Sequence, residues 1–128
     1  MRSLLRSLLS WCLLSWLAFG AQAGSVPFQQ AAFDKAVAAG GPVVVYLHAD
    51  WCPTCKQQTP IVAQLLAEPR MKSLQLFVAD FDTETALKKA LRVSNQSTFV
   101  VFKGGKEVAR STGETSRDAI EATFAKAL

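Results

Sequence analysis

Apolar residues in this chain occur in two patterns, short uninterrupted runs and helical spacings. Three runs, Val43–His48, Leu74–Ala79 and Thr98–Phe102, predict inner strands of a sheet, because strands buried on both faces need apolar residues at successive positions. Glu107–Ser111 is expected to pair with the third run as a hairpin across the turn Gly104-Gly105. These segments predict a sheet whose last two strands are antiparallel.

Apolar residues three or four positions apart predict helices between these strands. The four helices are expected at Gln29–Ala39, Pro53–Ala67, Thr83–Leu91 and from about Thr115 onward. We expect Asp82 to cap the third helix, Thr115–Asp118 to form a capping box for the fourth, and Pro60 to kink the second. Gly113 suggests a bulge or a sharp exit from the hairpin.

The element order is α-β-α-β-α-β-β-α, with a short edge strand expected near Val26. This order predicts the α/β class, with one mixed sheet covered by helices on both faces. The core is expected to hold five phenylalanines, namely Phe33, Phe77, Phe99, Phe102 and Phe124.

The first 23 residues predict a secretory signal peptide rather than part of the fold. Arg2 and Arg6 precede the apolar segment Ser7–Phe19, and Ala21-Gln22-Ala23 has the small-x-small pattern of a cleavage site. The apolar segment is shorter than the ~20 residues that span a bilayer, so an uncleaved anchor is the weaker alternative. We expect one domain, residues 24–128, exported to the periplasm or an equivalent compartment.

Removal of that segment lowers the formal net charge from +4 to +2, because two arginines leave with it. The densest remaining basic group, Lys88, Lys89 and Arg92, is typical of a solvated helix face. A nucleic-acid partner is therefore not expected.

The cysteines point to chemistry rather than to structural disulfides. Cys12 would leave with the signal peptide. Cys52 and Cys55 are too close in sequence for a disulfide between them to cross-link distant parts of the fold. At the start of a helix, residues three apart share one face, and the helix dipole favours a thiolate at the first of them. Cys52 is the predicted nucleophile and Cys55 the less exposed resolving thiol. Pro53 suits the first helical position, and Thr54 should tune the reduction potential.

The segment Ala49–Lys56, followed by Pro60, Thr98–Gly105 and Gly113, resembles the thioredoxin superfamily over nearly all of the expected mature chain. The resemblance implies a thioredoxin fold and thiol–disulfide exchange through a redox-active disulfide, with no other cofactor. It also implies a monomer that acts on disulfide-containing envelope proteins and is re-reduced by a membrane thiol-reductant conduit. Because oxidant lineages commonly insert a helical domain before the Ser97 loop, the short segment here favours a reductant.

The chain departs from the family pattern at three positions. Ser97 replaces the usual cis-proline, so we expect a trans Gln96–Ser97 peptide, because a cis bond before a non-proline residue costs about 2.5–4 kcal/mol. The loop Gln96, Ser97 and Thr98 is expected to hold substrate, and the Ser97 hydroxyl to donate to the thiolate. Tyr46 and Val78 replace a buried aspartate and its lysine partner, which leaves the deprotonation route of Cys55 open.

Several residues near the dithiol have more than one interpretation. His48, the single histidine, is either a proton shuttle, a packing side chain, or a copper or zinc ligand together with Cys52 and Cys55. The last interpretation defines an alternative function, a metal-binding or metal-delivery module. Trp51 is expected to form an apolar rim over Cys52, and Asp50 to be a solvated charge.

Overall fold

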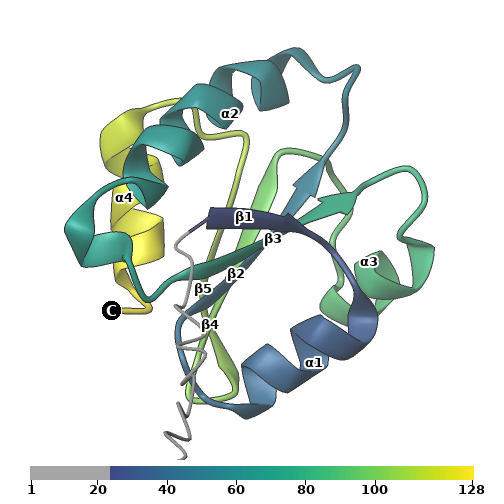
Figure 1. Cartoon of the computed structure of the whole chain (residues 1–128). Coiled ribbons are helices and arrows are strands. Elements are labelled where there is room, and N and C mark those ends of the chain that lie inside the picture. Colours follow the sequence, from purple (N-terminus) through teal and green to yellow (C-terminus); the bar gives the residue numbers. More distant parts are fainter. Residues whose placement is uncertain (1–23) are drawn as a thin grey trace, which may run out of the picture.

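The computed structural model describes residues 24–128 (Figure 1). The expected signal peptide, its cleavage site and Cys12 lie outside these residues. The elements are β1 (Gly24–Pro27), α1 (Gln30–Ala38), β2 (Val43–His48), α2 (Pro53–Leu66), a short 3₁₀ helix (Pro69–Met71), β3 (Gln75–Asp80), α3 (Thr85–Leu91), β4 (Thr98–Lys103), β5 (Lys106–Thr112) and α4 (Arg117–Ala125). Every predicted strand and helix forms, and only the 3₁₀ helix was not predicted.

The five strands form one mixed sheet in the order β1-β3-β2-β4-β5. Central β2 is parallel to β3 and antiparallel to β4, and β4 pairs with β5 in the predicted hairpin. The positive φ angles of Gly104 and Gly105, +60° and +77°, explain why the tight turn uses two glycines. The mixed sheet expected from the element order is confirmed.

Helices cover both faces of the sheet (Figure 1). One core, formed with α2 and α4, contains Phe99 and Phe124, whose rings meet edge to face. The other core, formed with α1 and α3, contains Phe33, Phe77 and Phe102. All five phenylalanines are at most 8% exposed, so the predicted core is confirmed. Within residues 24–128, no helix combines the length and hydropathy that a membrane span needs.

Two predicted helix caps are wrong. Helix α3 begins at Thr85 with Glu84 as its N-cap and no side-chain cap. Asp82 lies two residues before that N-cap, and its carboxylate accepts a hydrogen bond from the Trp51 indole. In α4 the cap is Ser116, whose Oγ accepts the Ala119 N–H at 3.4 Å. The cap therefore lies one residue later than predicted, and the third helical position is Ala119, whose methyl side chain cannot complete a capping box.

The hairpin has its register irregularity away from Gly113: Val101 and Phe102 of β4 pair with Ala109 and Glu107, so Val108 of β5 is the unpaired residue. Gly113 instead makes the sharp exit, with a φ of +76°, and its N–H donates to the Ser97 carbonyl at 3.0 Å. This bond ties the end of β5 to the loop before β4. Pro60 lies inside α2, which continues to Leu66.

Candidate functional site

Cys52 lies where β2 passes into α2. It is the N-cap of the helix, with an extended backbone, and Pro53 follows at the first helical position, as predicted. The Cys52 sulfur accepts a hydrogen bond from the Cys55 N–H at 3.1 Å. It thus satisfies an N–H at the positively polarised end of the helix, which favours a negative charge on sulfur.

The hydroxyl of Ser97 lies between the two sulfurs. Its Oγ is 3.0 Å from the Cys52 Sγ and 3.1 Å from the Cys55 Sγ. Both cysteines are free thiols. The two cysteines, three positions apart, and Ser97, more than 40 positions further along the chain, therefore meet in one hydrogen-bonded cluster, as the sequence predicted.

Both sulfurs are covered. Cys52 is 1% exposed and Cys55 0%, so the expected difference in exposure between nucleophile and resolving thiol is wrong. The reason is that Ser97, itself 3% exposed, packs against both sulfurs at the helix start.

The pKa of Cys52 is lowered from its ordinary value. Burial opposes ionisation of the thiol, but hydrogen bonds outweigh it: from the Cys55 side chain, from the Ser97 hydroxyl, and from the backbone N–H groups of Cys55 and Thr54. Since a thiolate is the nucleophile in disulfide exchange, this environment makes Cys52 the reactive sulfur of the pair.

Ser97 has an unusual backbone conformation. Its φ is +60°, in the left-handed region that costs a non-glycine residue about 1–2 kcal/mol. The described residues contain no cis peptide bond, so the trans Gln96–Ser97 peptide is confirmed. The Ser97 carbonyl accepts hydrogen bonds from the Gly113 N–H and, at 3.3 Å, from the Gln58 side chain. These contacts hold the strained residue in place.

Gln58 is a site residue that the sequence analysis missed. It is fully buried, its Nε2 also donates to the Glu114 carbonyl at 2.8 Å, and its Oε1 accepts the Tyr46 hydroxyl at 2.9 Å. The available signal was its position three residues after Cys55 and four before Val62, on the inner face of α2. A glutamine there requires buried hydrogen-bond partners.

Tyr46, at the position where the resemblance implies an aspartate, is nearly fully buried. Its hydroxyl also donates to the Cys55 carbonyl at 3.3 Å. Burial, and then the proximity of Cys55, raises the pKa of Tyr46 far above that of an ordinary tyrosine. The residue is therefore a neutral hydrogen-bond donor at physiological pH, and it cannot take the charged role of a carboxylate.

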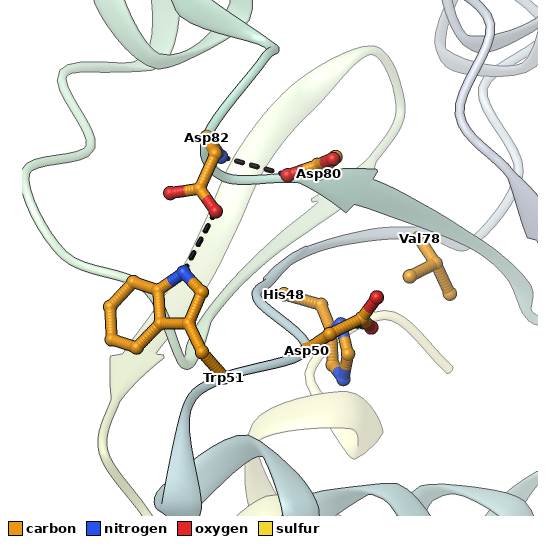
Figure 2. Close-up of a pocket in the computed structure, with 6 residues that line it drawn as sticks. All are labelled: His48, Asp50, Trp51, Val78, Asp80 and Asp82. Carbon is orange, nitrogen blue, oxygen red and sulfur yellow. Dashed lines mark hydrogen bonds and ion pairs between the residues drawn. The ribbon is translucent and has the colours of Figure 1, made fainter.

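His48, Asp50 and Trp51 line a surface cavity of about 430 Å³ (Figure 2). The His48 ring packs edge to face on Tyr46, with centroids 5.2 Å apart, and its Nδ1 lies 3.6 Å from the solvated Asp50 carboxylate. The Trp51 indole is 56% exposed and is held by Asp82 at 2.7 Å. These contacts are those expected of a packing His48, and its proton-shuttle role stays a prediction. The exposed Trp51 indole is directed to Asp82, so the predicted rim over Cys52 also stays a prediction.

The metal interpretation has no support in the described part of the chain. Residues 24–128 contain no group of three or more His, Cys, Asp or Glu side chains placed to hold a metal ion. His48 instead faces Asp50 and Tyr46.

The substrate-loop residues next to Ser97 occupy different environments. Gln96 is half-buried, whereas Thr98 is 2% exposed. The Thr98 hydroxyl donates to the Asn95 carbonyl at 2.8 Å and lies 2.9 Å from the Thr112 hydroxyl. Thr98 therefore stiffens the loop and the start of the hairpin.

Comparison of the sequence with known proteins finds one family. The thioredoxin family model matches residues 24–126. The chain is 37% identical over 89 residues to a thioredoxin of Chlamydia muridarum, an alignment that covers 69% of this chain and 84% of that protein. It is 34% identical over 82 residues to a thioredoxin of Chlamydia trachomatis, covering 64% and 78%.

Solved structures share the fold. The crystal structure of Trxlp from Edwardsiella tarda is 42% identical and superposes with a TM-score of 0.76, covering 79% of this chain and 98% of that one. A Malassezia sympodialis thioredoxin, at 20% identity, superposes with a TM-score of 0.72, which supports the fold alone. The expected fold is confirmed.

Proposed function

This chain belongs to the thioredoxin family and is a protein-disulfide oxidoreductase, and from that premise we propose that it is an exported reductant of disulfides in envelope proteins. One observation carries the proposal: the Cys52 sulfur lies at the start of α2, accepts the Cys55 N–H and shares the Ser97 hydroxyl with Cys55. A sulfur so placed is ionised at a lower pH than an ordinary thiol, and a second sulfur lies one helical turn away.

The exchange proceeds in two substitutions at sulfur. The Cys52 thiolate attacks one sulfur of a substrate disulfide, and the other substrate sulfur leaves as a thiolate. Cys55, having lost its proton, then attacks the Cys52 sulfur of the mixed disulfide. A Cys52–Cys55 disulfide forms and the second substrate thiolate leaves, so two electrons pass from protein to substrate.

Two features of the sequence support export and the direction of electron flow. Residues 1–23 have the basic, apolar and small-residue regions of a signal peptide. The connection between α2 and the Ser97 loop contains only a 3₁₀ helix, β3 and α3, without an inserted helical domain. Re-reduction by a membrane thiol-reductant conduit would return the disulfide to the dithiol, and the chain would act as a monomer.

Trapping of substrates tests the proposed function. In Cys55→Ser the mixed disulfide on Cys52 cannot be resolved, so envelope proteins should remain linked to it and be released by a reductant. The double variant Cys52→Ser/Cys55→Ser is the control and should trap none. If the variant captures no envelope protein and the purified native chain reduces no model protein disulfide, the proposal fails.

A further inference from the structure

The Ser97 hydroxyl has one proton and two sulfur neighbours at nearly equal distances, 3.0 Å to Cys52 and 3.1 Å to Cys55. It can donate to only one of them at a time and accepts from the other. With Cys52 ionised, the Ser97 O–H donates to the Cys52 thiolate, and the single Cys55 S–H proton has both the Ser97 Oγ and the Cys52 sulfur as acceptors. Rotation about the Cβ–Oγ bond is enough to turn the same proton toward Cys55.

We propose that the Ser97 hydroxyl serves the two sulfurs in turn, stabilising the Cys52 thiolate before substrate attack and the Cys55 thiolate once Cys52 is in the mixed disulfide. The inference rests on the proposed thiol–disulfide exchange and identifies the group that assists its second substitution. After the first substitution the Cys52 sulfur is no longer an anion, so the hydroxyl is released from it. Cys55 then becomes the only nearby sulfur that can carry charge.

The proton balance of the full cycle is simple. In its reactive form the reduced protein has one thiol proton, on Cys55, and one thiolate, on Cys52. The first substitution releases one substrate thiolate, which takes up the Cys55 proton through solvent. The second forms the Cys52–Cys55 bond and releases the other substrate thiolate, while the Ser97 hydroxyl keeps its own proton throughout.

The surroundings of Cys55 require such a donor. Cys55 is 0% exposed, so any hydrogen bond to its sulfur must come from a protein group rather than from bulk water. The nearby Tyr46 hydroxyl is directed to the Gln58 Oε1 and the Cys55 carbonyl oxygen. The Ser97 hydroxyl lies within hydrogen-bond distance of the Cys55 sulfur, at 3.1 Å.

The backbone around Ser97 is built to keep this hydroxyl between the sulfurs. Its left-handed conformation is held by two donors on its carbonyl, the Gly113 N–H and the Gln58 side chain. Gln58 is itself fixed by Tyr46 and the Glu114 carbonyl. Gln58 is therefore a positioning residue for Ser97.

Stopped-flow reaction with one equivalent of dithionitrobenzoate, a chromogenic disulfide, separates the two substitutions. Attack by Cys52 releases a first coloured thiolate, and attack by Cys55 on the mixed disulfide releases a second. Cys55→Ser, which should show the first phase alone, assigns the phases. Ser97→Gly removes the hydroxyl, and glycine accepts a φ of +60° without strain. Ser94→Gly, at an exposed serine in the same loop, is the matched control.

Because a hydrogen bond to a charged group changes an equilibrium by about tenfold or more, Ser97→Gly should slow both phases about tenfold at neutral pH. Both pH profiles should also move to higher pH, whereas Ser94→Gly should match the native chain. If only the first phase changes, Ser97 serves Cys52 alone and the inference is overturned. The same holds if neither phase changes. If the glycine variant does not fold, Ser97→Ala also removes the hydroxyl and gives the same comparison. If the native chain releases no coloured thiolate at all, the proposed function is overturned rather than this inference.

Discussion

Opposing influences act on the charge of the Cys52 sulfur. Burial destabilises the thiolate, whereas donors from Cys55, Ser97 and the first turn of α2 stabilise it, and the net effect lowers the pKa of Cys52. Ser97 contributes one of these hydrogen bonds although its own backbone is in the unfavourable left-handed conformation. Strain of this kind persists only where surrounding contacts hold it, and it concentrates at functional sites.

The lowered pKa of Cys52 predicts its reactivity toward iodoacetamide. The alkylation rate follows the thiolate fraction, so the midpoint of its pH profile should lie below about 8.5, the value for an unperturbed cysteine. Peptide mass mapping as a function of pH measures Cys52 separately from Cys55. A Cys52 midpoint at or above the ordinary value would contradict the assigned hydrogen bonds.

The raised pKa of Tyr46 predicts a loss of stability in alkali. Below about pH 10 the tyrosine is neutral in both folded and unfolded chains, so its contribution to stability is fully present. Above that pH only the unfolded chain ionises, and the free energy of unfolding falls as pH rises. The chain has one tyrosine, so tyrosinate absorbance reports Tyr46 alone.

Tyr46→Phe provides the comparison for this effect. The variant should be less stable at neutral pH by about 1–3 kcal/mol, because the buried Gln58 Oε1 loses its donor. Its stability should also fall less steeply above pH 10. An alkaline decline equal in both proteins would show that Tyr46 is not the group responsible.

At the scale of elements, α2 does more than present the dithiol. Its inner face carries Cys55 and Gln58, and Gln58 connects the helix to β2 through Tyr46 and to the loops that hold Ser97 and Glu114. The start of the helix and the Ser97 loop are therefore fixed relative to each other.

Replacement of Gln58 by methionine tests this connection. The side chain has a similar length but cannot make these hydrogen bonds, so the free energy of unfolding should fall by about 1–3 kcal/mol. Gln57→Met, at the exposed neighbouring glutamine, should change it by less than about 0.5 kcal/mol. Equal stability of the two variants in denaturant unfolding would refute the structural role of Gln58.

The elements were predictable because their signals are local. Valine-rich β2 is almost fully buried, and Gly40, Gly104 and Gly105 lie at turns with positive φ. The helix caps were less predictable, because capping depends on where a side chain finds its partner. Asp82 has a capping side chain, but the Trp51 indole lies within its reach.

The candidate site was predictable only in part for the same reason. Cys52, Cys55 and Ser97 could be identified from spacing and family resemblance. The cover over Cys52 and the network of Gln58 depend on contacts between segments about 40 or more residues apart in the chain. Such contacts leave no periodic signal in the sequence, although a glutamine on an apolar helix face marks where one is needed.

At the scale of the whole molecule, the sheet topology brings the dithiol and the Ser97 loop to the same end of the central strands. The carboxyl end of β2 leads to Cys52, and antiparallel β4 begins at the same end of the sheet, directly after Ser97. The topology thus explains why the Ser97 loop meets the dithiol.

The export proposal predicts a shortened chain in the cell. Intact mass spectrometry of the envelope fraction should find a chain that begins at Gly24, and replacement of Ala21 and Ala23 by bulky residues should retain the leader. Full-length protein starting at Met1 in the native envelope fraction would contradict cleavage.

The central claim, that Cys52 and Cys55 exchange electrons with other disulfides as a pair, is tested most directly by equilibration with glutathione buffers of graded potential. Mass spectrometry should show one two-electron transition to an intramolecular Cys52–Cys55 disulfide. Its potential should lie in the reducing half of the family range, which runs from about −270 to −120 mV. Separate glutathione adducts on the two cysteines, cysteines that stay reduced throughout, or a transition near −120 mV would contradict the account.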